Sequence, residues 1–158
     1  MTTVIRPCDD IPLARQLFRE YAAALGVDLK FQSFEAELAG LPGDYAPPAG
    51  RLLVAWFEGT PDGCVALRPL QKDICEMKRL WVRPASSGRG IGRRLAETVI
   101  AQAREIGYHT MRLDTLARLV PALNLYRSLG FQPVPPYTHN PLEGALFMEL
   151  RLDDGDEI

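Results

Sequence analysis

The sequence predicts an α/β domain with a mixed sheet, and three observations lead to this class. Apolar residues alternate along seven short segments and recur every three to four residues along four longer ones, as in strands and helices. In the middle of the chain, turn signals separate consecutive strands, which is typical of antiparallel hairpins. Later, helices separate the strands, and helical crossovers join strands that run parallel.

The composition favours one folded domain. The chain has 158 residues, of which 47% are hydrophobic and 24% are charged. A chain of this length can bury a core of its own. We expect a single domain over residues 1–152, followed by an acidic tail over residues 153–158. The net charge of −2 gives no general attraction to nucleic acid or membranes, so any site for an anion must be local.

The cysteines and the N-terminus indicate a cytoplasmic protein. Cys8, Cys64 and Cys75 lie far apart and form no Cys-x-x-Cys motif, so neither a disulfide framework nor a metal site is expected. The first residues lack the basic start and apolar run of a signal peptide. No apolar segment approaches the roughly 18 residues of a membrane span. We therefore expect no metal, no nucleic-acid partner and no membrane partner.

The first third of the chain is predicted to hold one strand and two helices. We expect a strand over Thr2–Arg6, a helix from Asp9 or Asp10 to Gly26, and a shorter helix from Ser33 to Leu41. Asp and Ser are favourable N-cap residues, and glycine is the usual residue after the last helical turn. The Pro- and Gly-rich segment that follows is read as a surface loop within the same domain.

Three consecutive strands are predicted next. They cover Arg51–Phe57, Gly63–Leu70 and Ile74–Val82. The segment Glu58–Asp62 between the first two is a turn signal, so these strands should form a hairpin. Alternate residues of a strand share a face. This alternation puts Glu76, Lys78 and Leu80 on one face of the third strand, and Cys75, Met77, Arg79 and Trp81 on the other.

The last third alternates helices and strands. We expect a helix over Ile91–Ile106, a strand over Thr110–Thr115, a helix over Pro121–Leu129, and strands over Phe131–Val134 and Ala145–Leu152. Glycines follow both helices, as expected at helix ends. A polar insertion that begins at Pro135 separates the last two strands.

A glycine-rich turn precedes the longest C-terminal helix. It contains Gly88, Gly90 and Gly92, together with Arg89, Arg93 and Arg94. A helix N-terminus leaves about four N–H groups unpaired and carries roughly half a positive charge. Glycines let such amides approach an anion closely. The turn is therefore a candidate site for a phosphate or pyrophosphate, although a turn without a ligand would have the same composition.

Two common phosphate motifs do not fit this turn. A Walker loop requires Lys and then Ser or Thr after its last glycine, whereas Arg93 and Arg94 follow Gly92. A dinucleotide fingerprint requires Gly-x-Gly-x-x-Gly after an early strand, and these glycines lack both the spacing and the position.

Two segments instead resemble the GNAT superfamily of N-acetyltransferases. Residues 77–95, MKRLWVRPASSGRGIGRRL, resemble its acetyl-coenzyme A loop, Arg/Gln-x-x-Gly-x-Gly/Ala. Gly90 and Gly92 match the glycines, while Ser87 stands at the Arg/Gln position. Residues 122–131, ALNLYRSLGF, resemble a later helix of the family through Ala122, Tyr126 and the final Gly-Phe pair. Leu119 stands where the family commonly has Asn.

The resemblance implies the GNAT fold and acetyl-coenzyme A as co-substrate. This fold has a mixed, mostly antiparallel sheet of six to seven strands, splayed between the fourth and fifth, with about four helices. The implied coenzyme-binding residues are Leu80, Trp81, Val82, Ser87, Gly88, Arg89, Gly90, Ile91, Gly92, Arg93 and Tyr126. The Leu80 N–H is implied as the donor to the acetyl oxygen, and the Tyr126 hydroxyl as the proton donor to the leaving thiolate.

Residues for the acceptor are assigned from the same chemistry. An ammonium must lose a proton before it can attack a thioester. Glu76 is the candidate base or acceptor ligand, and Asp114, Tyr137, His139 and Asn140 are candidate acceptor contacts. The alternatives are an ion pair of Glu76 with Lys78 or Arg112, a purely structural insertion, and a Tyr126 ring that only packs in the core.

The sequence therefore predicts an N-acetyltransferase that acts on the primary amine of a small molecule. A negative chain and a carboxylate at Glu76 favour a cationic acceptor. The alternatives are an acyl-coenzyme A sensor without turnover, and an interaction protein in which the turn holds no ligand. Members of the family are often dimers, so the resemblance also implies a possible homodimer.

Overall fold

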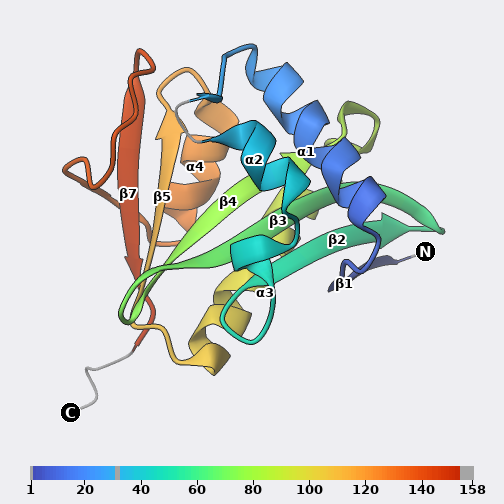
Figure 1. The fold of residues 1–158 in the computed structure, drawn as a ribbon, viewed down its shortest axis with the longest axis horizontal. Helices are drawn as coiled ribbons and strands as arrows, with labels where there is room; N and C mark the ends of the chain where they lie inside the picture. The colour runs from blue at the N-terminus through green and yellow to red at the C-terminus, as the bar shows by residue number, and fades with distance from the viewer. Residues whose placement is uncertain (1, 31–32, 154–158) are drawn as a thin grey trace.

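Seven strands form one sheet between two layers of helices (Figure 1). The computed structural model describes residues 2–30 and 33–153. In chain order, the strands are β1 (Thr3–Pro7), β2 (Arg51–Phe57), β3 (Thr60–Gln71), β4 (Ile74–Val82), β5 (Thr110–Leu116), β6 (Gln132–Val134) and β7 (Ala145–Arg151). Their spatial order is β1-β2-β3-β4-β5-β7-β6. The acidic tail expected over residues 153–158 lies outside the described residues from residue 154 onward.

Among the described residues, four α-helices cover the two faces of the sheet. They are α1 (Ile11–Leu25), α2 (Phe34–Ala39), α3 (Ile91–Ile106) and α4 (Val120–Ser128). Helices α1 and α2 pack on one face, where Phe18 and Leu38 meet Val54 of β2. Helices α3 and α4 pack on the opposite face, where Leu95 and Leu123 lie in a second core. None of the described helices is both long and apolar enough to cross a membrane.

The predicted sheet is confirmed, including its splay. Every neighbouring pair of strands is antiparallel except β4 and β5, which run parallel. These two strands pair only over Ile74–Glu76 and Thr110–Arg112. Beyond these residues β4 and β5 separate, so the main-chain groups of β4 after Glu76 have no partner on β5.

The local signals for α1 and α3 determine their boundaries. The Asp10 side chain accepts a hydrogen bond from the Leu13 amide at 3.1 Å, so Asp10 rather than Asp9 caps α1. Gly26 follows α1 with a φ of +68°. Helix α3 covers Ile91–Ile106 as predicted, with Gly90 and Gly107 in left-handed conformations at its two ends.

Two predicted boundaries differ from the structure by more than one residue. Strand β3 begins at Thr60 instead of Gly63, because Glu58 and Gly59 both have positive φ and form the whole turn. A two-residue turn of this kind matches the twist of a hairpin. Helix α2 ends at Ala39 instead of Leu41. Ser33 lies at its N-cap position, but its side chain forms no capping hydrogen bond.

A bulge in β4 overturns the predicted faces of this strand. Ala66 of β3 pairs with Lys78, and Cys64 pairs with Trp81, so one residue of β3 faces both Arg79 and Leu80. Arg79 has a φ of +60°. The extra residue shifts the alternation, because a bulge inserts one residue into one strand only. Lys78 and Arg79 therefore face α1 and α2 with Glu76, whereas Leu80 and Val82 face the core beneath α3, together with Cys75 and Met77.

Candidate active site

The turn between β4 and α3 presents unpaired amides at a positive helix end. Gly88 has a φ of +85° and Gly90 a φ of +73°. Gly90 is the N-cap of α3 and offers no side chain to the first-turn amides, and this turn contains no acidic residue. No side chain among the described residues caps the amides of Ile91, Gly92 and Arg93, which are thus left for an external acceptor. An anion at this position would gain both hydrogen bonds and the field of the helix dipole.

The arginines of the turn are held by neighbouring residues. Arg89 lies 3.6 Å from Asp62 and stacks over Phe57. Arg93 donates to Ser128 and lies 3.6 Å from Glu97. The Arg94 Nη1 group donates to the Thr3 carbonyl at 2.9 Å, which directs this side chain toward β1. Arg89 and Arg93 remain about half exposed beside the amides, so they add positive charge there.

A small cavity lies where β4 and β5 separate. Its volume is about 60 Å³. The polar residues around it are Tyr21, Lys78, Arg79, Asp114, Thr115 and Tyr126. Leu80, just after the bulge, also lines the cavity. The bulge therefore places both Leu80 and the charged Lys78 at the opening between the two strands.

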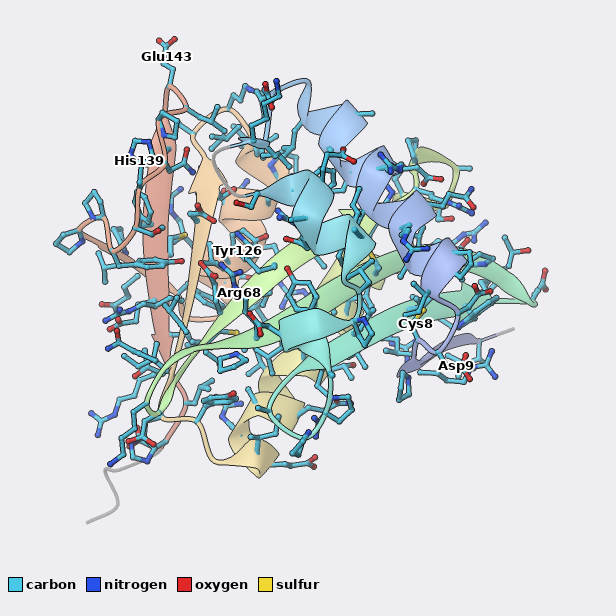
Figure 2. The ribbon with its side chains drawn as sticks, viewed as in Figure 1. Cys8, Asp9, Arg68, Tyr126, His139 and Glu143 are labelled. Atoms are coloured by element: carbon cyan, nitrogen blue, oxygen red, sulfur yellow. The ribbon has the colours of Figure 1, made fainter. Side chains whose placement is uncertain are left out.

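Tyr126 of α4 lines this cavity and belongs to the core beneath α3. Figure 2 labels its position. The residue is 8% exposed, and its ring packs edge-on against Phe131 at a centroid distance of 5.8 Å. Burial raises the pKa of Tyr126, and the nearby Tyr21 and Asp114 raise it further. The hydroxyl is therefore protonated at neutral pH and can act as a proton donor.

Glu76 is buried and both of its carboxylate oxygens are engaged. Oε1 accepts from Arg68 Nε at 2.9 Å and lies 2.8 Å from Nη2 of the same residue. Oε2 accepts from the Tyr137 hydroxyl at 2.6 Å. Arg68 is the direct cross-strand partner of Glu76, so β3 supplies the ion pair. The alternatives considered from the sequence, Lys78 and Arg112, do not hold it; Arg112 instead pairs with Glu149 at 2.9 Å.

A larger, charged cavity adjoins the opening on the α2 side of the sheet. It has a volume of about 220 Å³. The cavity is lined by Ser33, Glu37, Arg68, Glu76, Lys78, Arg79, Asp114, Thr138 and His139. Lys78, Arg79 and Asp114 line both cavities, so they form the boundary between the opening and the charged cavity.

The insertion between β6 and β7 supplies one wall of this region. His139 lines the charged cavity, and Figure 2 shows it on the loop before β7. Tyr137 contacts Glu76, and Asn140 Nδ2 donates to Asp114 Oδ2 at 3.0 Å. The structure thus brings together Glu76 and Asp114 with the three loop residues predicted as acceptor contacts.

Lys78 is a buried ammonium at the boundary of the two cavities. Its Nζ lies 3.7 Å from Asp114 Oδ1, and the side chains of Lys78 and Asp114 are only 5% and 7% exposed. Burial lowers the pKa of Lys78, while Glu76 and Asp114 act in the opposite direction. This lysine therefore carries its charge less readily than a lysine in water.

Two ion pairs fix the helices that cover the site. Arg79 donates to both carboxylate oxygens of Glu37 at 2.9 and 2.8 Å, which connects α2 to the bulge. Glu20 of α1 accepts from Trp81 Nε1 at 3.1 Å and from Arg83. The Trp81 side chain therefore points toward α1. Of the coenzyme contact that the resemblance implied for Trp81, only a main-chain contact is compatible with this orientation.

Sequence reasoning missed Arg68, Lys78, Arg79 and Glu37 as parts of the site. Arg68, Lys78 and Arg79 interrupt otherwise apolar strands, and a buried charge is a sign of a specific partner or ligand. Their convergence depends on the register of β3 with β4 and on the bulge, and neither follows from the residue pattern.

Comparison with known proteins agrees with this geometry. Residues 14–131 match the model of the acetyltransferase (GNAT) family. An uncharacterised N-acetyltransferase of Schizosaccharomyces pombe is 43% identical over 145 residues, which cover 90% of this chain and 89% of the relative.

Solved structures show the same fold. A GNAT acetyltransferase of Staphylococcus aureus superposes with a TM-score of 0.79 at 18% identity, covering 96% of this chain and all of that one. The yncA acetyltransferase of Salmonella typhimurium, solved with acetyl-CoA, superposes with a TM-score of 0.70 at 23% identity, covering 98% of this chain and 96% of that one. With its family match, its splayed sheet and its glycine turn, the chain belongs to the GNAT family of acetyltransferases.

Proposed function

We propose that this chain is a cytoplasmic N-acetyltransferase that transfers acetyl from acetyl-CoA to the primary amine of a small molecule. The observation that carries the proposal is the relation of three features along β4 and α3. The strands part after Glu76, the positive end of α3 follows β4, and Tyr126 reaches the opening between them. The Salmonella structure holds acetyl-CoA on the same fold, which supports the choice of co-substrate.

The proposed coenzyme contacts are assigned to main-chain groups of the glycine turn and of β4 that have no partner among the described residues. The coenzyme diphosphate would bind the main-chain amides between Gly88 and Arg93, because no side chain caps them. The pantetheine arm would lie along β4 beyond Glu76, where the strand has no β5 neighbour. The Leu80 N–H would then donate to the acetyl oxygen, which gains negative charge as the amine attacks.

The reaction forms a C–N bond and breaks the C–S bond of the thioester. The acceptor ammonium first loses a proton, and the free amine then attacks the acetyl carbon. Tyr137 is suited to relay that proton, since its hydroxyl donates to Glu76 Oε2 at 2.6 Å. The Tyr137 hydroxyl would take the proton from the amine as its own moves to Glu76. Tyr126, whose hydroxyl is protonated at neutral pH, would protonate the departing thiolate. The second proton that the nitrogen loses as the amide forms would then return the tyrosine to its neutral state.

Release of free thiol from acetyl-CoA, measured with a broad panel of amines, tests the proposal. Turnover with at least one small amine is expected. A ligand present at about 100 times its Kd adds about 2.7 kcal/mol of stability, so coenzyme A should also raise the melting temperature. A rise in melting temperature without turnover on any amine would favour the sensor instead, and the absence of both would exclude the proposed site.

A further inference from the structure

We propose that the acceptor carries a carboxylate as well as its amine, and that Arg68 and Lys78 bind this carboxylate in the charged cavity. The inference rests on the proposed function, because it names the substrate class of the same site. It replaces the cationic acceptor favoured by the net charge of the chain.

Arg68 has donor capacity that the protein does not use. Its Nε and Nη2 groups both approach Glu76 Oε1, whereas Nη1 forms no hydrogen bond within residues 2–30 and 33–153. The side chain is 33% exposed and lines the charged cavity. A guanidinium carries five donors in a planar fork and binds carboxylates with high geometric specificity. Arg68 can therefore hold Glu76 with one edge and a second carboxylate with Nη1.

Lys78 is the second unused donor. Its ammonium has three protons, yet its Nζ forms no hydrogen bond to any described residue. The 3.7 Å separation from Asp114 Oδ1 exceeds the length of a hydrogen bond. The ammonium lines the charged cavity, so an anionic ligand there could accept the hydrogen bonds that the described residues do not, and such charge-assisted bonds are strong.

The charges around the cavity favour a ligand that carries both a positive and a negative charge. Arg68, Lys78 and Arg79 are balanced by Glu37, Glu76 and Asp114 around the same cavity. Each of these carboxylates already faces a cation: Arg79 holds Glu37, Arg68 holds Glu76, and Lys78 faces Asp114. A polyamine would add positive charge where every carboxylate is matched. An amino acid adds no net charge, and its carboxylate meets the unused donors of Arg68 and Lys78.

The space beside Arg68 suits the remainder of such a molecule. A third cavity, of about 310 Å³, lies beside α2 and shares Ser33, Glu37 and Arg68 with the charged cavity. Small-molecule sites commonly have volumes of about 300–1,000 Å³. A side chain of the acceptor can thus extend past Arg68 while its amine points toward the opening at Lys78 and Asp114.

The experiment compares amino acids with their carboxamides as acceptors, with all rates expressed per unprotonated amine. Each pair keeps the amine and removes only the negative charge. The panel contains the standard amino acids and short ω-amino acids. The partner of each acid is the compound in which every carboxylate has been replaced by a carboxamide. We expect kcat/KM to favour the acid by at least about 10-fold, since a hydrogen bond to a charged group contributes about 1.5–3 kcal/mol.

Variants of Lys78 and Arg68 test whether these two residues cause the preference for acids. Lys78→Met and Arg68→Gln should each lower the acid-to-amide ratio at least about fivefold, and Arg68→Lys should restore part of it. Lys72→Met, at the exposed β3–β4 turn, is the matched control and should leave the ratio unchanged. The ratio within one variant does not depend on the folded fraction, so partial misfolding cannot imitate the effect. Arg68→Gln/Glu76→Gln removes the whole ion pair where the single variant is unstable, and its ratio should also fall.

The outcomes separate the inference from the function on which it rests. If wild-type enzyme uses amides or simple amines as well as acids, or if the ratio survives in both variants, the carboxylate site is wrong while the acetyltransferase stands. If no amine of any class releases thiol, the proposed function fails and the inference fails with it.

Discussion

Tyr126 is buried, and it lines the small cavity where β4 and β5 separate. Its ring packs against Phe131, and no described residue forms a hydrogen bond with its hydroxyl. Tyr126→Phe should therefore fold normally and bind acetyl-CoA with its affinity changed less than about threefold. We expect kcat to fall by about 100-fold, because general acid catalysis typically contributes 10²–10⁴-fold.

Steady-state thiol release and calorimetric titration of coenzyme A measure the two quantities separately. A loss of coenzyme affinity as large as the loss of kcat would show that Tyr126 is a binding residue and would contradict its role as the acid.

Glu76 and Tyr137 form a short hydrogen-bonded pair that the proposed relay uses as a unit. If the amine proton passes through Tyr137, then Tyr137→Phe and Glu76→Gln should each lower kcat by about 10- to 100-fold. The double variant should lose little more, because residues that act together give non-additive losses. Tyr137→Phe with wild-type kcat would show instead that the proton reaches Glu76 without this hydroxyl.

The two ends of α3 offer a matched test of the glycine turn. Gly90 and Gly107 both have positive φ, and a Cβ on either would meet no atom within 4 Å. Alanine at either position should cost about 1–2 kcal/mol of folding free energy from backbone strain alone. Only Gly90→Ala lies at the amides proposed to bind diphosphate, so it alone should also weaken coenzyme A binding, by about 10-fold or more.

Urea unfolding and calorimetric titration of both variants measure these effects. Equal coenzyme affinity in Gly90→Ala and Gly107→Ala would place the diphosphate away from the turn.

Local signals made the elements predictable, and α3 shows why. Glycines at both of its ends and an unbroken apolar face define Ile91–Ile106 without reference to the rest of the fold. The β4 bulge has no comparable signal. Arg79 adopts a φ of +60°, which residues other than glycine disfavour. In this conformation its guanidinium forms the bidentate contact with Glu37 and lies over the rings of Tyr21 and Phe34. These partners belong to other elements, so strict alternation assigned Leu80 to the wrong face.

Which residues line the candidate site also depends on tertiary contacts that the sequence does not show. The sequence predicted Glu76 and the loop residues Tyr137 and His139 as members of the candidate site, because their types suit acid–base chemistry or polar contacts, and the structure places them around one region. The sequence did not identify Arg68, since its pairing with Glu76 depends on the β3–β4 register. The charges around the cavity also depend on tertiary structure, because the cavity contains balanced charges that the net charge of −2 does not reveal.

At the scale of the whole molecule, Glu20 connects the helical layer to the end of β4. The hydrogen bond from Arg83, assisted by Trp81, lowers the pKa of Glu20 below its ordinary value of 4.5. A carboxylate with a depressed folded-state pKa stabilises the protein above its unfolded pKa, and this contribution is lost as the pH falls through the folded value. Because the pair is partly exposed, the contribution should not exceed about 1 kcal/mol.

Melting temperatures of wild type and Glu20→Gln across pH check this prediction. Wild type should melt up to about 2–4 °C higher at pH 7, and the two curves should converge by about pH 3. A difference that persists unchanged at pH 3 would show that Glu20 stabilises the fold by packing instead of charge.

The central claim is that the parting of β4 and β5 and the positive end of α3 together bind the thioester carrier. A crystal structure of the protein with acetyl-CoA tests this most directly. We expect the diphosphate on the amides between Gly88 and Arg93, the pantetheine arm along β4 beyond Glu76, and the sulfur within hydrogen-bonding reach of the Tyr126 hydroxyl. A coenzyme bound with its diphosphate elsewhere, or its thioester outside the opening, would contradict the account.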